Sequence, residues 1–295
     1  MKILLYIALI LAGFHHNYVD GQGSNYSLKA FESYKQKDFV TAKVWIDSAK
    51  MNNEITTDRQ YLLHGLIYRE LENKNGCRTA ALESLSKAKS IASTISLKEQ
   101  IDKYIYNTTL KTYEEAYNFL QEGELNKSEA RYLKYKEQLL QYYDPTHNFD
   151  ELDVNYFNTL GSAWQQNNQF ADIDDQIRQL NTAVEKFNKS LKIDPENFNA
   201  IYSIGVAYYN LGADLIEYAN PKMPIEKLNE IQETALRLFK NGLPQLLKAN
   251  KMDPKNTEVL MGLRNIYHAM QDDEKSDYYK RLIEEITGKP IKEGE

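Results

Sequence analysis

Residues 183–195, which read Ala-Val-Glu-Lys-Phe-Asn-Lys-Ser-Leu-Lys-Ile-Asp-Pro, carry the pattern that decides the fold. The small Ala183 is followed four residues later by the large Phe187, and the small Ser190 comes three residues after that. Pro195 ends the segment, because proline cannot continue a helix. An apolar segment with a glycine in its middle follows. Small residues alternating with large ones at helical spacing predict two helices that pack closely together.

This segment resembles the tetratricopeptide repeat, a helix-turn-helix unit of about 34 residues. After the proline, Ile201, Ile204 and Tyr208 give an apolar helix, with Gly205 in its middle. Small residues at the eighth and twentieth positions of the repeat let its two helices approach, and large residues fill the space between them. The resemblance implies an all-α, right-handed superhelical solenoid made of stacked helix pairs.

The same pattern recurs along the chain and predicts about six helix pairs over residues 24–287. It is clearest between Phe157 and Pro254 and weakest in the third unit, whose first helix begins far upstream, near Leu97. The units are marked by Ala30, Ala42, Ile46 and Ala49; by Gly65, Ala81, Leu85 and Ala88; by Ala116, Ser128 and Tyr132; by Gly161, Ala183 and Ser190; by Gly205, Leu246 and Ala249; and by Leu260, Arg264, Tyr267 and Ile283.

The fourth and fifth units are longer than the repeat requires. Gly161 and Gly205 lie 44 residues apart, and the apolar period through Ile173, Ile177 and Leu180 predicts an extended second helix in the fourth unit. In the fifth unit the first helix is predicted to reach Asn220-Pro221, and a second helix to start at Pro224 and to kink at Pro244. These features predict an extended hairpin in the fifth pair, which rises past its neighbours.

The N-terminus predicts an export signal over residues 1–23. Met1 and Lys2 precede the apolar run Ile3 to Ala12, which is too short for the roughly 20 residues that span a bilayer but suits a secretory signal. Cleavage is expected near Gly21 or Gly23, although a first packed helix is the alternative. The extended fifth unit also resembles those of exported tetratricopeptide proteins of Gram-negative bacteria, and this resemblance implies a periplasmic or secreted protein. Residues 288–295 are expected to form a disordered tail.

Composition excludes several classes of function. The chain carries 36 Lys and Arg against 42 Asp and Glu, a net charge of −6, without the basic patch that nucleic acid requires. Cys77 is the only cysteine, and the five histidines lack metal-ligand or catalytic spacing. No catalytic motif or cofactor-binding motif is present, so we expect neither enzymatic activity nor a cofactor.

The loop Asp144 to Glu151 gathers one His and three carboxylates, and whether it binds a metal stays open.

The resemblance also predicts which residues line the concave groove of the solenoid. The lining is rich in amides and nearly uncharged, which suits hydrogen bonds to an extended peptide. The chain is therefore expected to be a protein-interaction scaffold that uses this groove and the hairpin; a glycan-binding or transport accessory module is the alternative. A solvated face without a ligand explains the lining about as well. The predicted groove residues are Asn155, Asn158, Ser162, Gln165, Gln166, Asn199, Tyr202, Tyr209, Asn210, Met261, Asn265 and His268, with Glu258 beside them.

Overall fold

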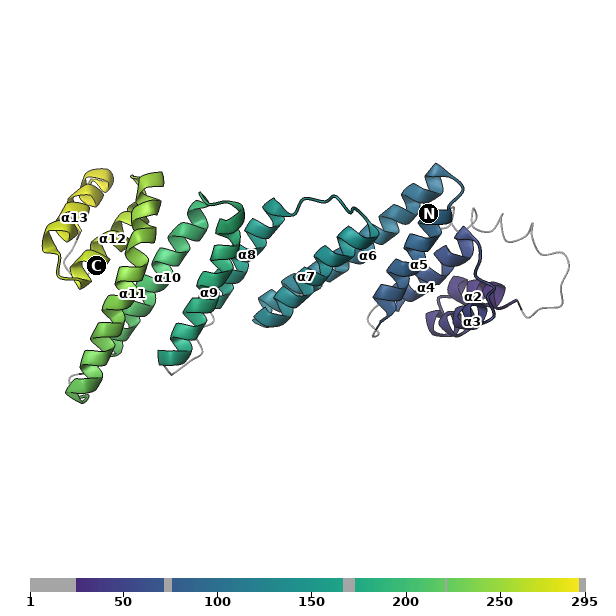
Figure 1. Ribbon diagram of the computed structural model, residues 1–295, viewed down its shortest axis with the longest axis horizontal. Helices are drawn as coiled ribbons and strands as arrows, with labels where there is room; N and C mark the ends of the chain where they lie inside the picture. The colour runs from purple at the N-terminus through teal and green to yellow at the C-terminus, as the bar shows by residue number, and fades with distance from the viewer. Residues whose placement is uncertain (1–24, 72–75, 167–172, 221, 292–295) are drawn as a thin grey trace. The chain divides into compact units, whose positions relative to one another are not determined.

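The computed structural model describes residues 25–71, 76–166, 173–220 and 222–291, and all regular structure in these ranges is α-helical (Figure 1). These described residues form 12 helices in consecutive pairs, which confirms the prediction of an all-α fold built from about six pairs. The helices are α2 (Tyr26–Lys35), α3 (Phe39–Met51), α4 (Asp58–Glu70), α5 (Cys77–Ile91), α6 (Ile95–Gln121), α7 (Leu125–Tyr142), α8 (Asp150–Gln166), α9 (Ile173–Ile193), α10 (Phe198–Tyr218), α11 (Ile225–Met252), α12 (Thr257–Ala269) and α13 (Asp273–Thr287).

The described chain divides into two compact units. The first contains residues 25–118 and 128–147, and the second contains residues 119–127 and 148–291. The predicted export signal and the end of the predicted tail, residues 292–295, lie outside the described residues. Gly288 closes α13, and the backbone N–H of Ile291 donates to Glu284 Oε1 at 2.9 Å. The right hand of the superhelix stays a prediction.

Short polar residues begin the helices where the sequence changes from turn to apolar period. The carboxylate of Asp38 accepts from the backbone N–H of Thr41 at 3.0 Å and so caps the start of α3. Thr57 and Gln60 form a capping box at the start of α4. Asn197 caps α10 by accepting from Ala200 N at 3.0 Å. These caps satisfy backbone N–H groups that have no partner inside the helix.

In the second and fourth pairs a glycine of the first helix packs against a large residue of the second helix. A Cβ atom added to Gly161 would lie 2.8 Å from the Phe187 ring, and one added to Gly65 would lie 2.7 Å from Leu85. Real Cβ atoms do not approach other atoms this closely, so only glycine permits this spacing without a shift. The predicted close approach of the two helices is therefore present in both of these pairs.

Serine replaces the small apolar residue at two contact positions and keeps the close approach. Ser128 of α7 donates from Oγ to the Ala116 carbonyl of α6 at 2.8 Å, and it is fully buried. Ser190 of α9 donates to the Val154 carbonyl of α8 at 3.3 Å. Each buried hydroxyl thus has an acceptor, which removes the cost of burying an unpaired polar group.

The fourth and fifth pairs contain long second helices. α9 begins at Ile173, as its apolar period predicted, and α11 begins at Ile225 with Pro224 as its N-cap, one residue after the predicted start. α11 then continues through Pro244 without a break. The described helices include none that is long and apolar enough to span a membrane.

Gly242 in α11 gives a test of the close approach in the fifth pair. A Cβ atom there would lie 2.9 Å from the Gly205 carbonyl oxygen, a backbone atom of α10. We expect Gly242→Ala to lower the free energy of unfolding by about 1–3 kcal/mol, although alanine favours a helix more than glycine does. Urea unfolding measures this change, with Asn241→Ala at the exposed neighbouring position as the control. Equal or greater stability of Gly242→Ala would contradict the close approach.

A candidate partner-binding face

The twelve predicted groove residues lie on the first helices of the last three pairs, all in the second unit. α8, α10 and α12 follow one another there, because each packs beside the first helix of the next pair. α8 carries Asn155, Asn158, Ser162, Gln165 and Gln166; α10 carries Asn199, Tyr202, Tyr209 and Asn210; and α12 carries Met261, Asn265 and His268.

Hydrogen bonds between neighbouring first helices bring part of this set together. Tyr202 of α10 donates from its hydroxyl to Glu258 Oε2 of α12 at 3.2 Å. Seven residues further along α10, the hydroxyl of Tyr209 accepts from Asn265 Nδ2 at 3.1 Å. Seven residues are about two helical turns, so both tyrosines lie on the side of α10 that faces α12. α10 and α12 therefore share one polar face.

The link from α8 to α10 passes through a residue that sequence reasoning did not assign to the groove. Asn158 Nδ2 donates to the side-chain oxygen of Asn197 at 3.0 Å, and the same oxygen accepts from Ala200 N at 3.0 Å. The helix cap of α10 therefore also anchors α8. The sequence places Asn197 between the Asp-Pro stop and an apolar helix, and this position predicts a helix cap but not the hydrogen bond from Asn158.

The groove residues differ in how much of the side chain solvent can reach. Asn158, Ser162, Gln165, Tyr202, Tyr209, Met261 and Asn265 are half-buried. The exposed ones are Asn155, Gln166, Asn199, Asn210 and His268. The half-buried residues include all those with a bond to another helix, so they hold the face in place, and the exposed residues are free to reach a ligand.

Both tyrosines of the face also contact other aromatic rings. The Tyr202 ring lies parallel to the Phe198 ring, with 5.9 Å between centroids. The Tyr209 ring packs against Phe239 of α11 at 6.0 Å, so this residue belongs partly to the core. Burial raises the pKa of the Tyr202 hydroxyl, and the negative charge of Glu258 and the hydrogen bond to it raise that pKa further. Tyr202 therefore stays a neutral hydrogen-bond donor at physiological pH.

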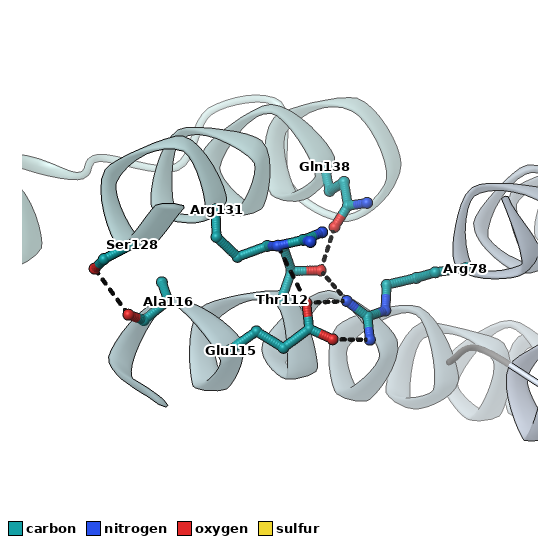
Figure 2. A network of polar contacts seen from close by, with 7 residues as sticks. All are labelled: Arg78, Thr112, Glu115, Ala116, Ser128, Arg131 and Gln138. Atoms are coloured by element: carbon teal, nitrogen blue, oxygen red, sulfur yellow. Dashed lines mark hydrogen bonds and ion pairs between the residues drawn. The ribbon is translucent and has the colours of Figure 1, made fainter. Parts of the chain in front are cut away.

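The first unit contains a polar network that the sequence did not predict (Figure 2). Arg78 of α5 binds Glu115 of α6 with both guanidinium ends, at 2.9 Å and 2.6 Å, and donates to Thr112 Oγ1 at 3.1 Å. Thr112 in turn donates to Gln138 Oε1 of α7 at 2.7 Å, and Arg131 Nε lies 3.2 Å from Glu115 Oε2. The network therefore joins the second helix pair to both helices of the third.

The electrostatics of this network indicate a structural role. Burial by itself would raise the pKa of the Glu115 carboxyl, but the hydrogen bond from Arg78 and the charges of Arg78 and Arg131 together lower it below the usual value. The Arg78 side chain is only 11% exposed, and two of its guanidinium nitrogens bind the two carboxylate oxygens of Glu115.

Other groups with possible chemistry do not form a site. His64 Nδ1 lies 2.7 Å from Ser84 Oγ, but both residues are buried, and a substrate has no access to them. Burial, followed by the charge of Lys50, lowers the pKa of His64 to about 4. Asp144 accepts from the backbone and hydroxyl of Thr146, as a turn-forming carboxylate does. Among the described residues, no three His, Cys, Asp or Glu side chains are placed to hold a metal ion.

Comparison with known proteins identifies one repeat directly. Residues 178–212 match the family model of the TPR repeat, and this stretch contains all of residues 183–195, whose pattern predicted the fold. The chain thus contains a TPR repeat, and such repeats generally serve as protein-interaction scaffolds and are usually not enzymes. No curated protein matches the chain.

Solved structures with a similar arrangement share little sequence with this chain. The C-terminal part of a TPR repeat-containing protein from Cytophaga hutchinsonii is 15% identical, with 97% of this chain and 91% of that chain covered and a TM-score of 0.29. The human IFIT1 dimer with m7Gppp-AAAA is 13% identical over 96% of this chain, with a TM-score of 0.32. A monomeric IFIT1 mutant with Gppp-AAAA has a TM-score of 0.34 at 13% identity over 95% of this chain. This chain spans 55% of the length of both IFIT1 chains.

The Arg78–Glu115 network gives a pH-dependent prediction. Because the pKa of Glu115 in the folded protein lies below its ordinary value of 4.5, the ionised carboxylate stabilises the fold above that pH. This contribution is lost as the pH falls through the folded pKa. We expect Glu115→Gln to lower the free energy of unfolding by about 1–3 kcal/mol at pH 7 and by less below pH 4.5.

Urea unfolding at a series of pH values measures both differences. The matched control is Glu114→Gln, which changes the exposed neighbour on the same helix. A pH-independent difference between the wild type and Glu115→Gln would show that the charge of Glu115 does not stabilise the network.

Proposed function

We propose that this protein is a non-enzymatic scaffold that binds an extended peptide segment of a partner protein along the α8–α10–α12 face. The observation that supports this proposal is the row of exposed Asn155, Asn199 and Asn210 beside half-buried residues that are already hydrogen-bonded between helices. Asparagine side chains both donate and accept, so they can pair with the N–H and C=O groups of an extended backbone.

The bonds between helices make such a face favourable for binding. Tyr202–Glu258 and Tyr209–Asn265 already hold their side chains in the free protein. Binding then loses less side-chain entropy than it would on a face of freely rotating residues. The scarcity of charge on this face favours recognition of the backbone over recognition of charged side chains.

We further propose the end of the fifth pair as a second docking surface. The two tyrosine contacts each join a residue of α10 to the residue 56 positions later in α12, so the two helices run in parallel with a constant offset. At this offset Ala269, the last residue of α12, lies at the level of Ala213 in α10. α10 continues beyond this level to Tyr218, and Figure 1 shows the α10–α11 end projecting past α12 and α13. Ile216, Tyr218 and Ile225 are 46%, 61% and 63% exposed there, a set of apolar side chains of the kind that partners cover.

The peptide-binding proposal predicts the effect of arginine at two exposed face positions. Asn155→Arg with Asn199→Arg replaces two amides by bulky charged groups without touching a bond between helices. We expect the captured partner to bind the double variant at least roughly tenfold more weakly, since two net hydrogen bonds are lost. Affinity capture from a cell-envelope extract with mass spectrometry identifies the partner, and titration of that partner gives the dissociation constants.

The matched control is Asn181→Arg, an exposed asparagine on α9 of the same unit. Equal loss of binding in the control would mean that added charge, and not the face, is responsible. Unchanged binding by the double variant would rule out the face as the peptide site.

A glycan-binding accessory function is the second candidate, because Phe198 and Tyr202 form a parallel aromatic pair beside exposed Asn199. Aromatic rings stack on the apolar faces of sugars, and amides bond their hydroxyl groups. If the ligand is a glycan, oligosaccharide retention on the immobilised protein disappears in Tyr202→Ala. Protein capture through the hairpin is then unaffected, which separates the two functions.

We also propose that the protein is exported and acts in the periplasm or outside the cell. This rests on Met1 and Lys2, on the apolar run Ile3 to Ala12 and on the small residues Gly21 and Gly23 after it. N-terminal sequencing of the protein recovered from cells tests the proposal. An N-terminus close to Gln22 or Ser24 is expected, and an intact Met1 would contradict it.

A further inference from the structure

The second helix of the first pair carries an apolar ridge that no other described element of the first unit covers. Val40, Val44 and Met51 of α3 are 56%, 58% and 84% exposed, and their spacing of four and seven residues places them along one side of the helix. We call these three residues the α3 ridge. From Val40 to Met51 the ridge is about 16 Å long at 1.5 Å per residue.

The other repeats of the chain show that this ridge is not a requirement of the fold. The ridge residues lie two before, two after and nine after Ala42, the buried small residue of α3. The corresponding positions, counted from the small contact residue of each second helix, are Thr79, Glu83 and Ser90 in α5 and Asn181, Glu185 and Lys192 in α9. In α7, α11 and α13 at most one of the three is apolar. The packing of repeats therefore does not explain the ridge, whereas a docking role does.

Along the ridge the lysines outnumber the aspartates by three to two, although the whole chain has a net charge of −6. Lys37 precedes the ridge, Lys43 lies within it and Lys50 lies at its end. Two acidic residues lie between them. Asp38 accepts from Thr41 N and caps α3, and Asp47 is paired with Lys43, whose Nζ lies 2.6 Å from Asp47 Oδ2. The ridge thus presents three apolar side chains with a local excess of positive charge.

We propose that the α3 ridge binds an anionic lipid surface, with α3 lying parallel to the membrane plane. The side chains protrude, as the 84% exposure of Met51 shows, so they can enter a soft planar interface without a matching groove on a partner. Lys37 and Lys50 then lie at the level of the lipid phosphates. A second copy of this chain is a poorer occupant, because its ridge carries the same positive charge. This inference does not depend on the peptide-binding proposal.

Vesicle co-sedimentation tests the proposal with the chain from Gln22 onward, which contains all the described helices. The probes are vesicles of phosphatidylcholine alone and vesicles of phosphatidylcholine mixed with the anionic phosphatidylglycerol. We expect binding to the anionic vesicles only, weakened by salt. Val40→Asp with Val44→Asp should reduce the partition coefficient at least tenfold, and Lys37→Gln with Lys50→Gln should reduce it by roughly tenfold or more.

The matched control is Leu133→Asp, which places the same charge at an apolar position of α7 that is 50% exposed. Circular dichroism and the melting temperature show whether each variant folds, and the lysine variant keeps the test valid if the aspartate variant does not. Equal binding to neutral vesicles, unchanged binding by the ridge variants, or no binding by the wild type would each overturn the proposal. Light scattering that shows a dimer abolished by the ridge variants would assign the ridge to a second copy and overturn it as well.

Discussion

The close approach of two helices at a glycine is the contact on which the rest of this structure depends. Gly161 against Phe187 and Gly205 against Leu246 leave no room for a Cβ atom, so α8 lies directly on α9 and α10 lies directly on α11. Leu246 also contacts Gly262 of the next pair, where an added Cβ would lie 2.9 Å from it. One large side chain therefore sets the spacing within a pair and between pairs. The shared face of α8, α10 and α12 exists because this spacing repeats.

Polar groups are used differently in the two units. In the first unit Arg78, Glu115 and Thr112 turn a junction between pairs into a hydrogen-bonded network, and this network leaves little of the arginine exposed. In the second unit the bonds Tyr202–Glu258 and Tyr209–Asn265 lie at the surface, with exposed amides beside them. A buried network specifies how helices pack, whereas half-buried bonds hold side chains ready for a ligand. This difference is why the second unit is the better candidate for binding.

The positions on the shared face of α8, α10 and α12 could be predicted because they follow from helical periodicity. Once Gly205 is placed at the contact, Tyr202 and Tyr209 must lie on a neighbouring side of α10, and their counterparts on α12 follow in the same way. Their hydrogen-bond partners could not be predicted, because a bond such as Asn158 to Asn197 depends on the distance between two helices. The same applies to Arg78 and Glu115, which lie on helices of different pairs and share no motif.

Local pattern alone determined that this chain is all-α, that its helices come in pairs, and where those pairs begin and end. These features depend on residues close together in the sequence, so they can be seen there directly. They are the small residues at helical spacing, the capping residues such as Asp38 and Asn197, and Pro195 after α9. The tertiary structure alone decided which polar side chains meet and which apolar ones stay exposed. Val44 and Ile46 lie two residues apart in α3, yet Val44 is 58% exposed and Ile46 is fully buried, because only Ile46 faces the neighbouring helices.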